Sequence, residues 1–221
     1  MTTVIIDYNS GNLRSAEKSF QLMSDELGMG QIKVSSDPEI VSKADRVVLP
    51  GVGAFADCKQ GLNSISGLYE AIEGHVKTGK PFMGICVGMQ LMGTCGHEHG
   101  YHKGFDWIKG DVKIMLPNDK NLKIPHMGWN NLNISGNHPI FNNINENDHV
   151  YFVHSYHLEV KDNKNLIASV DYGGKITAAV AHENIIGTQF HPEKSQTIGL
   201  KVISNFFKME SLILKIYLFL F

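Results

Sequence analysis

Short apolar runs alternate with amphipathic stretches in the first part of the chain. Residues 4–8 form an apolar run that ends in a polar turn, and residues 12–23 carry apolar side chains at a helical spacing. Similar runs predict strands at 32–34, 46–49 and 81–85. The stretches between the last two runs predict helices at 55–62 and 68–77. This alternation is typical of a parallel β-sheet covered by helices on both faces.

Beyond about Asp111 the pattern changes to closely spaced strands. Turn signals such as Gly173-Gly174 separate apolar runs at 112–116, 130–134, 149–158, 166–171, 176–181 and 185–189. A helix over 195–207 follows, with Val202 and Phe206 on one face. We therefore expect an α/β fold in which a central, mostly parallel sheet is flanked by helices and the second half is strand-rich. We expect one domain over residues 1–208.

The expected site lies at the carboxyl ends of the parallel strands, where such sheets bind ligands. Cys86 follows the run at 81–85 and lies between Gly84 and Gly88, so it is expected on a strand-to-helix turn flanked by glycines. This is the nucleophile-elbow arrangement, in which a sharp turn exposes a nucleophile. A buried core cysteine is the alternative, because free cysteines are commonly of that kind.

His191 and Glu193 lie two residues apart, so on an extended segment their side chains point the same way. A carboxylate in that position can hold the imidazole tautomer and stabilise its cation. Alone, the His-Pro-Glu motif is more often an ordinary loop. Together with Cys86 it completes a set of nucleophile, base and orienting acid, which predicts a cysteine hydrolase.

Pro50-Gly51-Val52-Gly53 comes directly after the strand at 46–49. It is either a simple tight turn or part of an oxyanion hole. In the second interpretation, backbone N–H groups at Val52 or Gly53 and at Val87 bind the negative oxygen of a tetrahedral intermediate, each worth on the order of 3 kcal/mol. A peptide there that flips to aim its N–H inward also acts as a switch.

Composition limits the partners to small molecules and proteins. The formal net charge is −2 with interspersed signs, which provides no basic face for nucleic acid. Cys58, Cys86 and Cys95 form no even framework and the N-terminus has no secretory pattern, so we expect a cytoplasmic protein with free thiols. The apolar tail at 209–221 is atypical. Its apolar run at 212–221 is too short for a membrane span, which needs roughly 20 apolar residues.

Several segments resemble those of the class I glutamine amidotransferase family, and within it the glutaminase subunits of imidazole glycerol phosphate synthases. The Gly-x-Cys-x-Gly and His-Pro-Glu motifs belong to the whole family, whereas Pro-His-Met-Gly-Trp-Asn and His-Pro-Glu-Lys-Ser are more particular to these subunits. The segments extend from near residue 4 to about residue 208. They are Asp7–Asn12, Pro50–Gly53, Gly84–Gln90, Pro125–Asn130, Tyr151–Tyr156 and Gln189–Ser195.

The resemblance implies a cofactor-free glutaminase reaction. Cys86 attacks the side-chain amide of glutamine, His191 protonates the departing ammonia, and Glu193 orients His191. Water then hydrolyses the thioester to glutamate. Positions that hold the amino-acid end of glutamine are matched by Gln90, Glu98, Ser155 and Tyr156. For Glu98, which lies between two histidines, a solvated loop is the alternative.

The implied partner is a separate (β/α)8-barrel cyclase subunit, bound as a heterodimer. It receives the ammonia and forms imidazole glycerol phosphate and aminoimidazole carboxamide ribonucleotide in histidine biosynthesis. Interface positions of the family are matched by Asn12, His126, Trp129 and Lys194. For His126 and Trp129, packing beneath a loop is the alternative. We expect the isolated chain to hydrolyse glutamine poorly until a nucleotide-loaded partner binds.

Other functions stay open at this point. Related glutaminase subunits supply ammonia for the amination of cell-surface sugars, and stand-alone γ-glutamyl hydrolases or peptidases have the same type of fold. The intact Cys86, His191 and Glu193 set argues against a catalytically silent binding module. A zinc site on the histidines of the 97–102 segment is not expected, because no thiol or carboxylate cluster at the usual spacing completes it.

Overall fold

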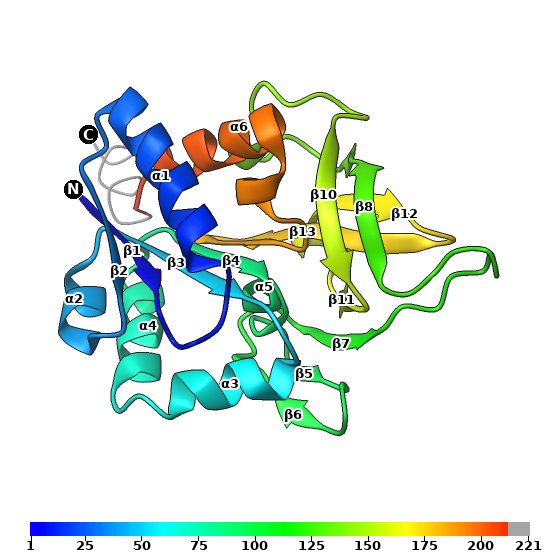
Figure 1. Cartoon of the computed structure of the whole chain (residues 1–221), viewed down its shortest axis with the longest axis horizontal. Helices are drawn as coiled ribbons and strands as arrows, with labels where there is room; N and C mark the ends of the chain where they lie inside the picture. The colour runs from blue at the N-terminus through cyan, green and yellow to red at the C-terminus, as the bar shows by residue number, and fades with distance from the viewer. Residues whose placement is uncertain (212–221) are drawn as a thin grey trace.

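Parallel strands form the first half of the central sheet (Figure 1). The computed structural model describes residues 1–211, and within them this sheet has the strand order β2-β1-β3-β4-β14-β13-β12-β9. The predicted tail run at 212–221 lies outside the described residues. The parallel strands are β1 (Thr2–Ile6), β2 (Gln31–Ser35), β3 (Arg46–Gly51), β4 (Phe82–Cys86) and β14 (Ile185–Thr188).

Mostly antiparallel strands complete the molecule and confirm the expected strand-rich second half. The far side of the central sheet is formed by β13 (Lys175–His182), β12 (Leu166–Asp171) and β9 (Asn133–Ile134). A two-stranded sheet pairs β8 (His126–Asn131) with β10 (His149–His154). A four-stranded sheet contains β11 (Tyr156–Val160), β7 (Gly110–Ile114), β5 (Cys95–Gly96) and β6 (His102–Lys103), with β5 and β7 as a parallel pair.

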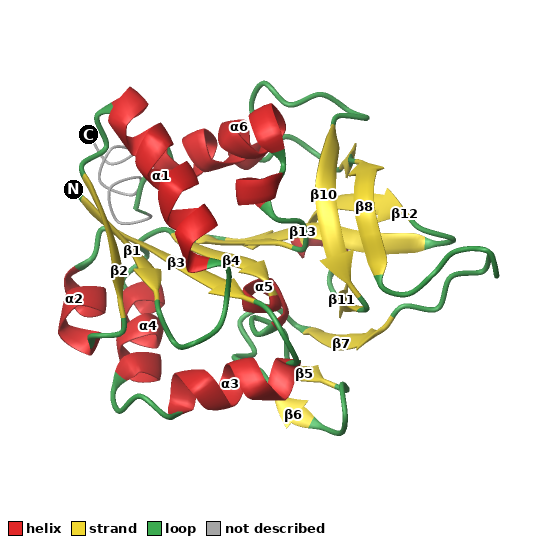
Figure 2. Ribbon diagram, in the orientation of Figure 1, coloured by secondary structure: helices red, strands yellow, loops and turns green. Residues whose placement is uncertain are grey.

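Helices cover both faces of the parallel half, as the alternating pattern predicts (Figure 2). On one face lie α1 (Leu13–Leu27) and α6 (Gln196–Phe207), which pack against each other, with Phe20 of α1 edge-on to Phe206 and Phe207. The other face carries α2 (Pro38–Lys43), α3 (Phe55–Asn63) and α4 (Leu68–Lys77). Short 3-10 turns lie at Pro139–Phe141, Asn163–Asn165 and Pro192–Lys194. In the described part of the chain, no helix has the length and apolar character that crossing a membrane requires.

Several elements differ from the sequence-based expectation, including the two-residue strands β5 and β6, which no pattern predicts. The single strand expected at 149–158 is two strands, β10 and β11, which meet at Ser155 and belong to different sheets. The strand expected at 130–134 is likewise divided between β8 and β9. Helix α2 was not expected, because six residues are too few to show a repeating helical pattern of apolar positions. Its start signals are present all the same: the Asp37 side chain accepts a hydrogen bond from Glu39 N–H at 2.8 Å, and Pro38 is the first helical residue.

We predict that acidification destabilises the fold through His75. This residue of α4 is 2% exposed, its Nε2 is 3.0 Å from Pro81 O, and burial lowers its pKa from 6.5 to about 4. The unfolded chain therefore binds the proton first, so this contribution is fully present above pH 6.5 and is lost as the pH falls through 4. The full effect is about 3 kcal/mol.

Urea unfolding at a series of pH values measures this contribution. The variant His75→Gln keeps a donor for Pro81 O and carries no titrating group, so its stability should fall less between pH 7 and pH 4 than that of the parent chain. Equal pH slopes for the two proteins would contradict the assignment.

Candidate functional site

Cys86 occupies a sharp turn between β4 and the short helix α5 (Val87–Gln90). Its backbone has φ 55° and ψ −111°, a conformation that costs a non-glycine residue about 1–3 kcal/mol. Tight packing holds it there: a Cβ on Gly84 would lie 2.5 Å from Gly88 O, and one on Gly88 would overlap Leu49 O. The structure therefore has the strand-to-helix elbow that the glycine pattern predicts.

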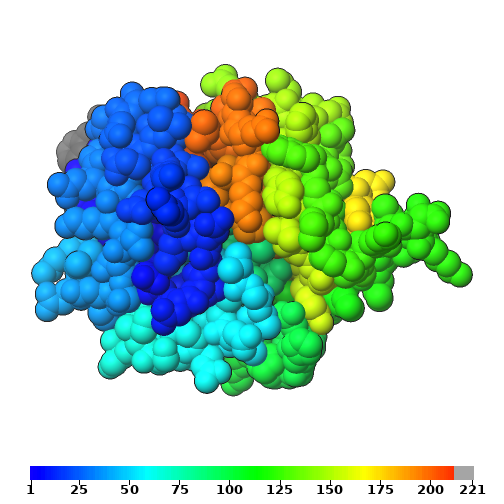
Figure 3. All heavy atoms as spheres, viewed as in Figure 1, coloured from blue at the N-terminus to red at the C-terminus, as the bar shows by residue number. Residues whose placement is uncertain are grey.

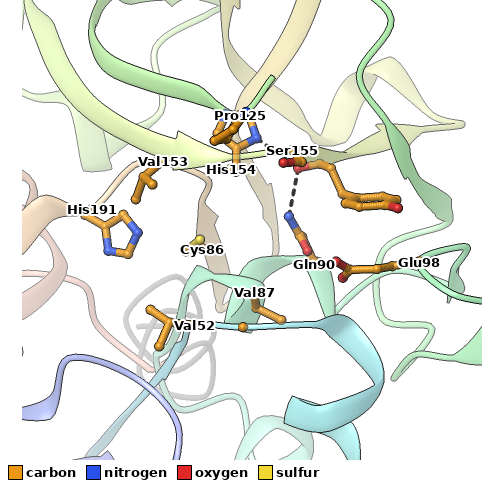
Figure 4. Close-up of a pocket in the computed structure, with 12 residues that line it drawn as sticks. Val52, Cys86, Val87, Gln90, Glu98, Pro125, Val153, His154, Ser155 and His191 are labelled. Carbon is orange, nitrogen blue, oxygen red and sulfur yellow. Dashed lines mark hydrogen bonds between the residues drawn. The ribbon is translucent and has the colours of Figure 1, made fainter. Parts of the chain in front are cut away.

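His191 and Glu193 form a buried pair beside this elbow. His191 Nδ1 lies 2.8 Å from Glu193 Oε1, and the two side chains are 2% and 3% exposed. The His191 backbone is fixed as well, because its N–H donates to Tyr151 O at 3.0 Å and its carbonyl accepts from Ser195 Oγ at 2.7 Å. Within residues 1–211, Nε2 of His191 has no hydrogen-bond partner. His191 and Cys86 line the same cavity, and the His191 ring points toward the Cys86 sulfur (Figure 4).

The electrostatic surroundings favour the charged form of His191. Burial lowers its pKa, but the interactions with Cys86 and Glu193 outweigh that effect and raise the pKa to about 9. Nearby His154 is in the opposite state, because burial lowers its pKa to about 3. One imidazolium, held by a carboxylate and facing a thiol, is an arrangement that can transfer a proton to a leaving group.

A cavity of about 350 Å³ opens over Cys86 and His191. In the space-filling view, cyan, blue-green, yellow-green and orange segments surround a hollow on this face (Figure 3). The cavity brings together every residue predicted for the oxyanion hole and for substrate binding. These are Val52, Gly53, Val87, Gln90, Glu98, Ser155 and Tyr156.

Gln90 and Glu98 are held in place at the cavity wall. Gln90 Nε2 donates to Tyr156 O at 2.9 Å and to Gln189 Oε1 at 3.1 Å, which ties α5 to β11 and to the residue that follows β14. Glu98 Oε2 accepts the Phe55 N–H at 2.8 Å, at the start of α3. The structure thus places Glu98 at the cavity, where its carboxylate can meet a cationic group.

The Val52 peptide is turned toward Ser10. The Val52 N–H donates to Ser10 Oγ at 3.2 Å, while the Ser10 hydroxyl donates to Val52 O at 2.7 Å. Gly53, with φ 101°, follows directly. The N–H of Val52 is therefore bound to Ser10 in this conformation, and a peptide rotation would be required to aim it at an oxygen above Cys86.

The four predicted interface residues differ in exposure. Trp129 is 44% exposed on β8, whereas His126 is 2% exposed and stacked between Phe152 and Tyr172 at centroid distances of 4.8 and 4.0 Å. His126, the first residue of β8, is therefore a buried packing residue and not part of the exposed surface. Asn12 precedes α1, and Lys194 lies in the turn after His191, with its Nζ 5.9 Å from the Tyr151 ring centroid.

Two polar residues at the site escaped prediction, as did the cavity-lining Pro125 and Val153. Gln189 is fully buried and its Nε2 lies 3.7 Å from Cys86 Sγ. Its position two residues before His191 was the available signal, since alternate residues of an extended segment share a face. His154 lines the cavity and its Nδ1 lies 2.9 Å from Tyr156 O. Nothing in the local sequence distinguishes it from an ordinary strand histidine.

A buried thiol on an elbow, a carboxylate-bound histidine and a cavity at the carboxyl edge of a parallel sheet define a cysteine-dependent hydrolase site. The family model "Glutamine amidotransferase class-I" matches residues 4–209, and the chain belongs to that family.

Two relatives with more than 50% sequence identity match nearly the whole chain. The chain is 54% identical over 207 residues to "Imidazole glycerol phosphate synthase subunit HisH" of Cereibacter sphaeroides, covering 93% of this chain and 98% of that one. It is 51% identical over 213 residues to the protein of the same name from Brucella suis, covering 94% and 99%.

Solved structures show the same fold at low sequence identity. A glutamine amidotransferase from Thermotoga maritima has a TM-score of 0.60 at 16% identity and covers 87% of this chain and 76% of that one. A further glutamine amidotransferase structure has a TM-score of 0.69 at 14% identity and covers 93% and 97%. The expected amidotransferase-like α/β fold is confirmed.

We predict that Cys86→Ala abolishes glutamine hydrolysis and that Glu193→Gln lowers kcat about 10²- to 10⁴-fold, because the amide no longer stabilises a cationic His191. Glutamate release measures both effects. Ser42→Ala, which removes a small polar group of α2 that does not line the cavity, is the control. Unchanged activity in Cys86→Ala would exclude the nucleophile assignment.

We also predict that Ser10→Ala raises the glutaminase rate of the isolated chain. Loss of the hydroxyl weakens the hold on the Val52 peptide by about 1 kcal/mol, which enriches the rotated form about fivefold. Ser10→Thr retains the hydroxyl and should behave like the parent. A fall in activity for Ser10→Ala would mean that Ser10 supports the active conformation instead.

Proposed function

We propose that this chain is the glutaminase subunit of an imidazole glycerol phosphate synthase, acting in histidine biosynthesis. One arrangement carries the proposal: Cys86 and His191 line the same cavity, and Glu193 lies 2.8 Å from Nδ1 of His191, so a nucleophile, a base and an orienting acid for amide hydrolysis are together. The identity of 51–54% to subunits named HisH, over nearly the whole chain, supports the choice of pathway.

In the proposed reaction, Cys86 Sγ gives its proton to His191 and attacks the side-chain carbonyl carbon of glutamine. The carbonyl oxygen becomes an oxyanion that accepts N–H bonds from Val87 and, after rotation of its peptide, from Val52 or Gly53. His191 gives a proton to the departing nitrogen, which leaves as ammonia. Water then attacks the thioester, His191 accepts a proton from that water, and glutamate is released with the thiol restored.

Glutamine is oriented by its amino-acid end. Glu98 supplies a carboxylate for the substrate ammonium, and the bond from Phe55 N–H to its Oε2 keeps that carboxylate at the cavity wall. Ser155 and Tyr156 lie where β10 ends and β11 begins, so backbone groups of both are available to the substrate. Gln90 joins these walls through its bonds to Tyr156 and Gln189.

The proposed partner is a (β/α)8-barrel cyclase subunit that binds the face around the cavity mouth. Trp129 packs edge-on against Tyr151 at 5.9 Å, and Lys194 lies over the same Tyr151 ring. Tyr151 and Val153 share one face of β10, and Val153 lines the cavity. An aromatic and basic patch therefore adjoins the cavity, and aromatic side chains of this kind commonly dominate the binding energy of an interface.

The Val52 peptide provides a way to couple glutamine hydrolysis to partner binding. Partner binding that draws this segment away from Ser10 would aim its N–H toward the oxyanion, so hydrolysis would begin only when the acceptor is ready. In this proposal residues 1–208 form the glutaminase domain, and 209–221 is an appended apolar tail.

The decisive test measures glutamate release by the purified chain, alone and with the cyclase subunit from the same source, with and without the cyclase's nucleotide ligand. We expect a low rate alone and strong stimulation by partner and nucleotide together. A high rate that ignores the cyclase would instead indicate an independent hydrolase or another acceptor enzyme.

An interface variant separates docking from chemistry in the same assay. Trp129→Ala should weaken cyclase binding at least tenfold while leaving the basal rate unchanged. Leu22→Ala, which truncates a similarly exposed apolar residue in the second half of α1, is the control and should bind normally.

A further inference from the structure

Three potential metal ligands, Cys95, His97 and Asp111, lie close together at strands β5 and β7 of the four-stranded sheet. Cys95 of β5 is directly paired with Asp111 of β7 in the parallel register, so their side chains leave the sheet next to each other. His97 lies two residues after Cys95 and extends from the same face. One ligand atom from each of the three side chains lies within 4.8 Å of the others.

The separations match those of a tetrahedral zinc site. Cys95 Sγ lies 3.5 Å from His97 Nε2 and 3.5 Å from Asp111 Oδ1. Zinc bonds of about 2.3 Å to sulfur and about 2.0–2.1 Å to nitrogen or oxygen, at tetrahedral angles, place those atom pairs about 3.5–3.6 Å apart. The two atom pairs that include sulfur therefore already have the separations of a zinc site, and the third pair, a His97 nitrogen and an Asp111 oxygen, lies within 4.8 Å.

We propose that Cys95, His97 and Asp111 bind a Zn²⁺ ion, with water in the fourth position. One sulfur, one imidazole and one carboxylate at tetrahedral spacing suit zinc better than magnesium or calcium, which prefer oxygen ligands only. The site is separate from the catalytic cavity, because none of the three residues lines it.

Binding replaces contacts that the three residues make without the ion. The Cys95 S–H, which points at Asp111, gives its proton to solvent as the sulfur–zinc bond forms, and no electron is transferred. Lys161 Nζ, 3.3 Å from Asp111 Oδ1, moves aside because the ion takes over that carboxylate. Lys161 is mostly exposed, so its release to water costs little.

The ion would tie β5 to β7 one residue before Glu98. Glu98 lines the glutamine cavity and accepts the Phe55 N–H. The site thus lies where it can fix the segment that carries a substrate-binding carboxylate. The sequence offered three histidines close together, but His99 and His102 are not members of the group that forms in the described structure.

Cobalt provides a direct test, because a thiolate–Co²⁺ bond absorbs in the near ultraviolet and tetrahedral geometry intensifies the visible bands. Full-length Cys86→Ser protein, which lacks the catalytic thiol, should bind one equivalent of Co²⁺ with both signals. Zn²⁺ should displace the cobalt and raise the Tm by mass action.

Variants in the Cys86→Ser background locate the ligands. Cys95→Ser should remove the charge-transfer band and the Zn²⁺-dependent rise in Tm, and His97→Asn should weaken binding at least tenfold. His99→Asn, a neighbouring histidine outside the group, should bind like the parent. His97 is exposed, so its variant stays informative even if Cys95→Ser unfolds. Absence of the band in the parent, or its persistence in a folded Cys95→Ser protein, would overturn the proposal.

Discussion

The close packing of the Cys86 turn against the central sheet is the constraint on which the site depends. Four neighbouring positions have no room for a side chain: Gly51, Gly84, Gly88 and Gly187. Gly51 and Gly84 lie against the backbone of Gly88, and Gly187 lies against Met89, so α5 is packed closely onto three adjacent strands. That contact holds Cys86 in a backbone conformation it would otherwise leave.

The order of the strands then places the Val52 peptide and His191 on either side of Cys86. Gly51 is the register partner of Cys86, which puts the Val52 peptide beside the nucleophile. On the other side, β14 runs parallel to β4 and leads directly into Gln189 and His191. The break at Ser155 turns the chain from one small sheet into another and closes the cavity. Three sheets therefore meet around one thiol.

The buried histidines divide into two electrostatic classes. His75, His126 and His154 have pKa values lowered to about 4, 4 and 3, mainly by burial, and are neutral at neutral pH. His191 alone of these has its pKa raised, because Glu193 and Cys86 offset the same burial. The molecule thus keeps a positive charge at the one imidazole that faces the nucleophile.

The sequence by itself determined the features that arise from short-range geometry. Glycines around Cys86 predicted the elbow, alternate positions predicted the His191–Glu193 pair, and periodicity predicted most of the parallel strands and long helices, because turns and side-chain direction depend on nearby residues. The tertiary structure decided which distant segments meet. Val52 with Ser10, Cys95 with Asp111, the division at Ser155 and the burial of His126 all depend on strand order and register, which are chosen by the packing of the whole core and have no signature in a local stretch of chain.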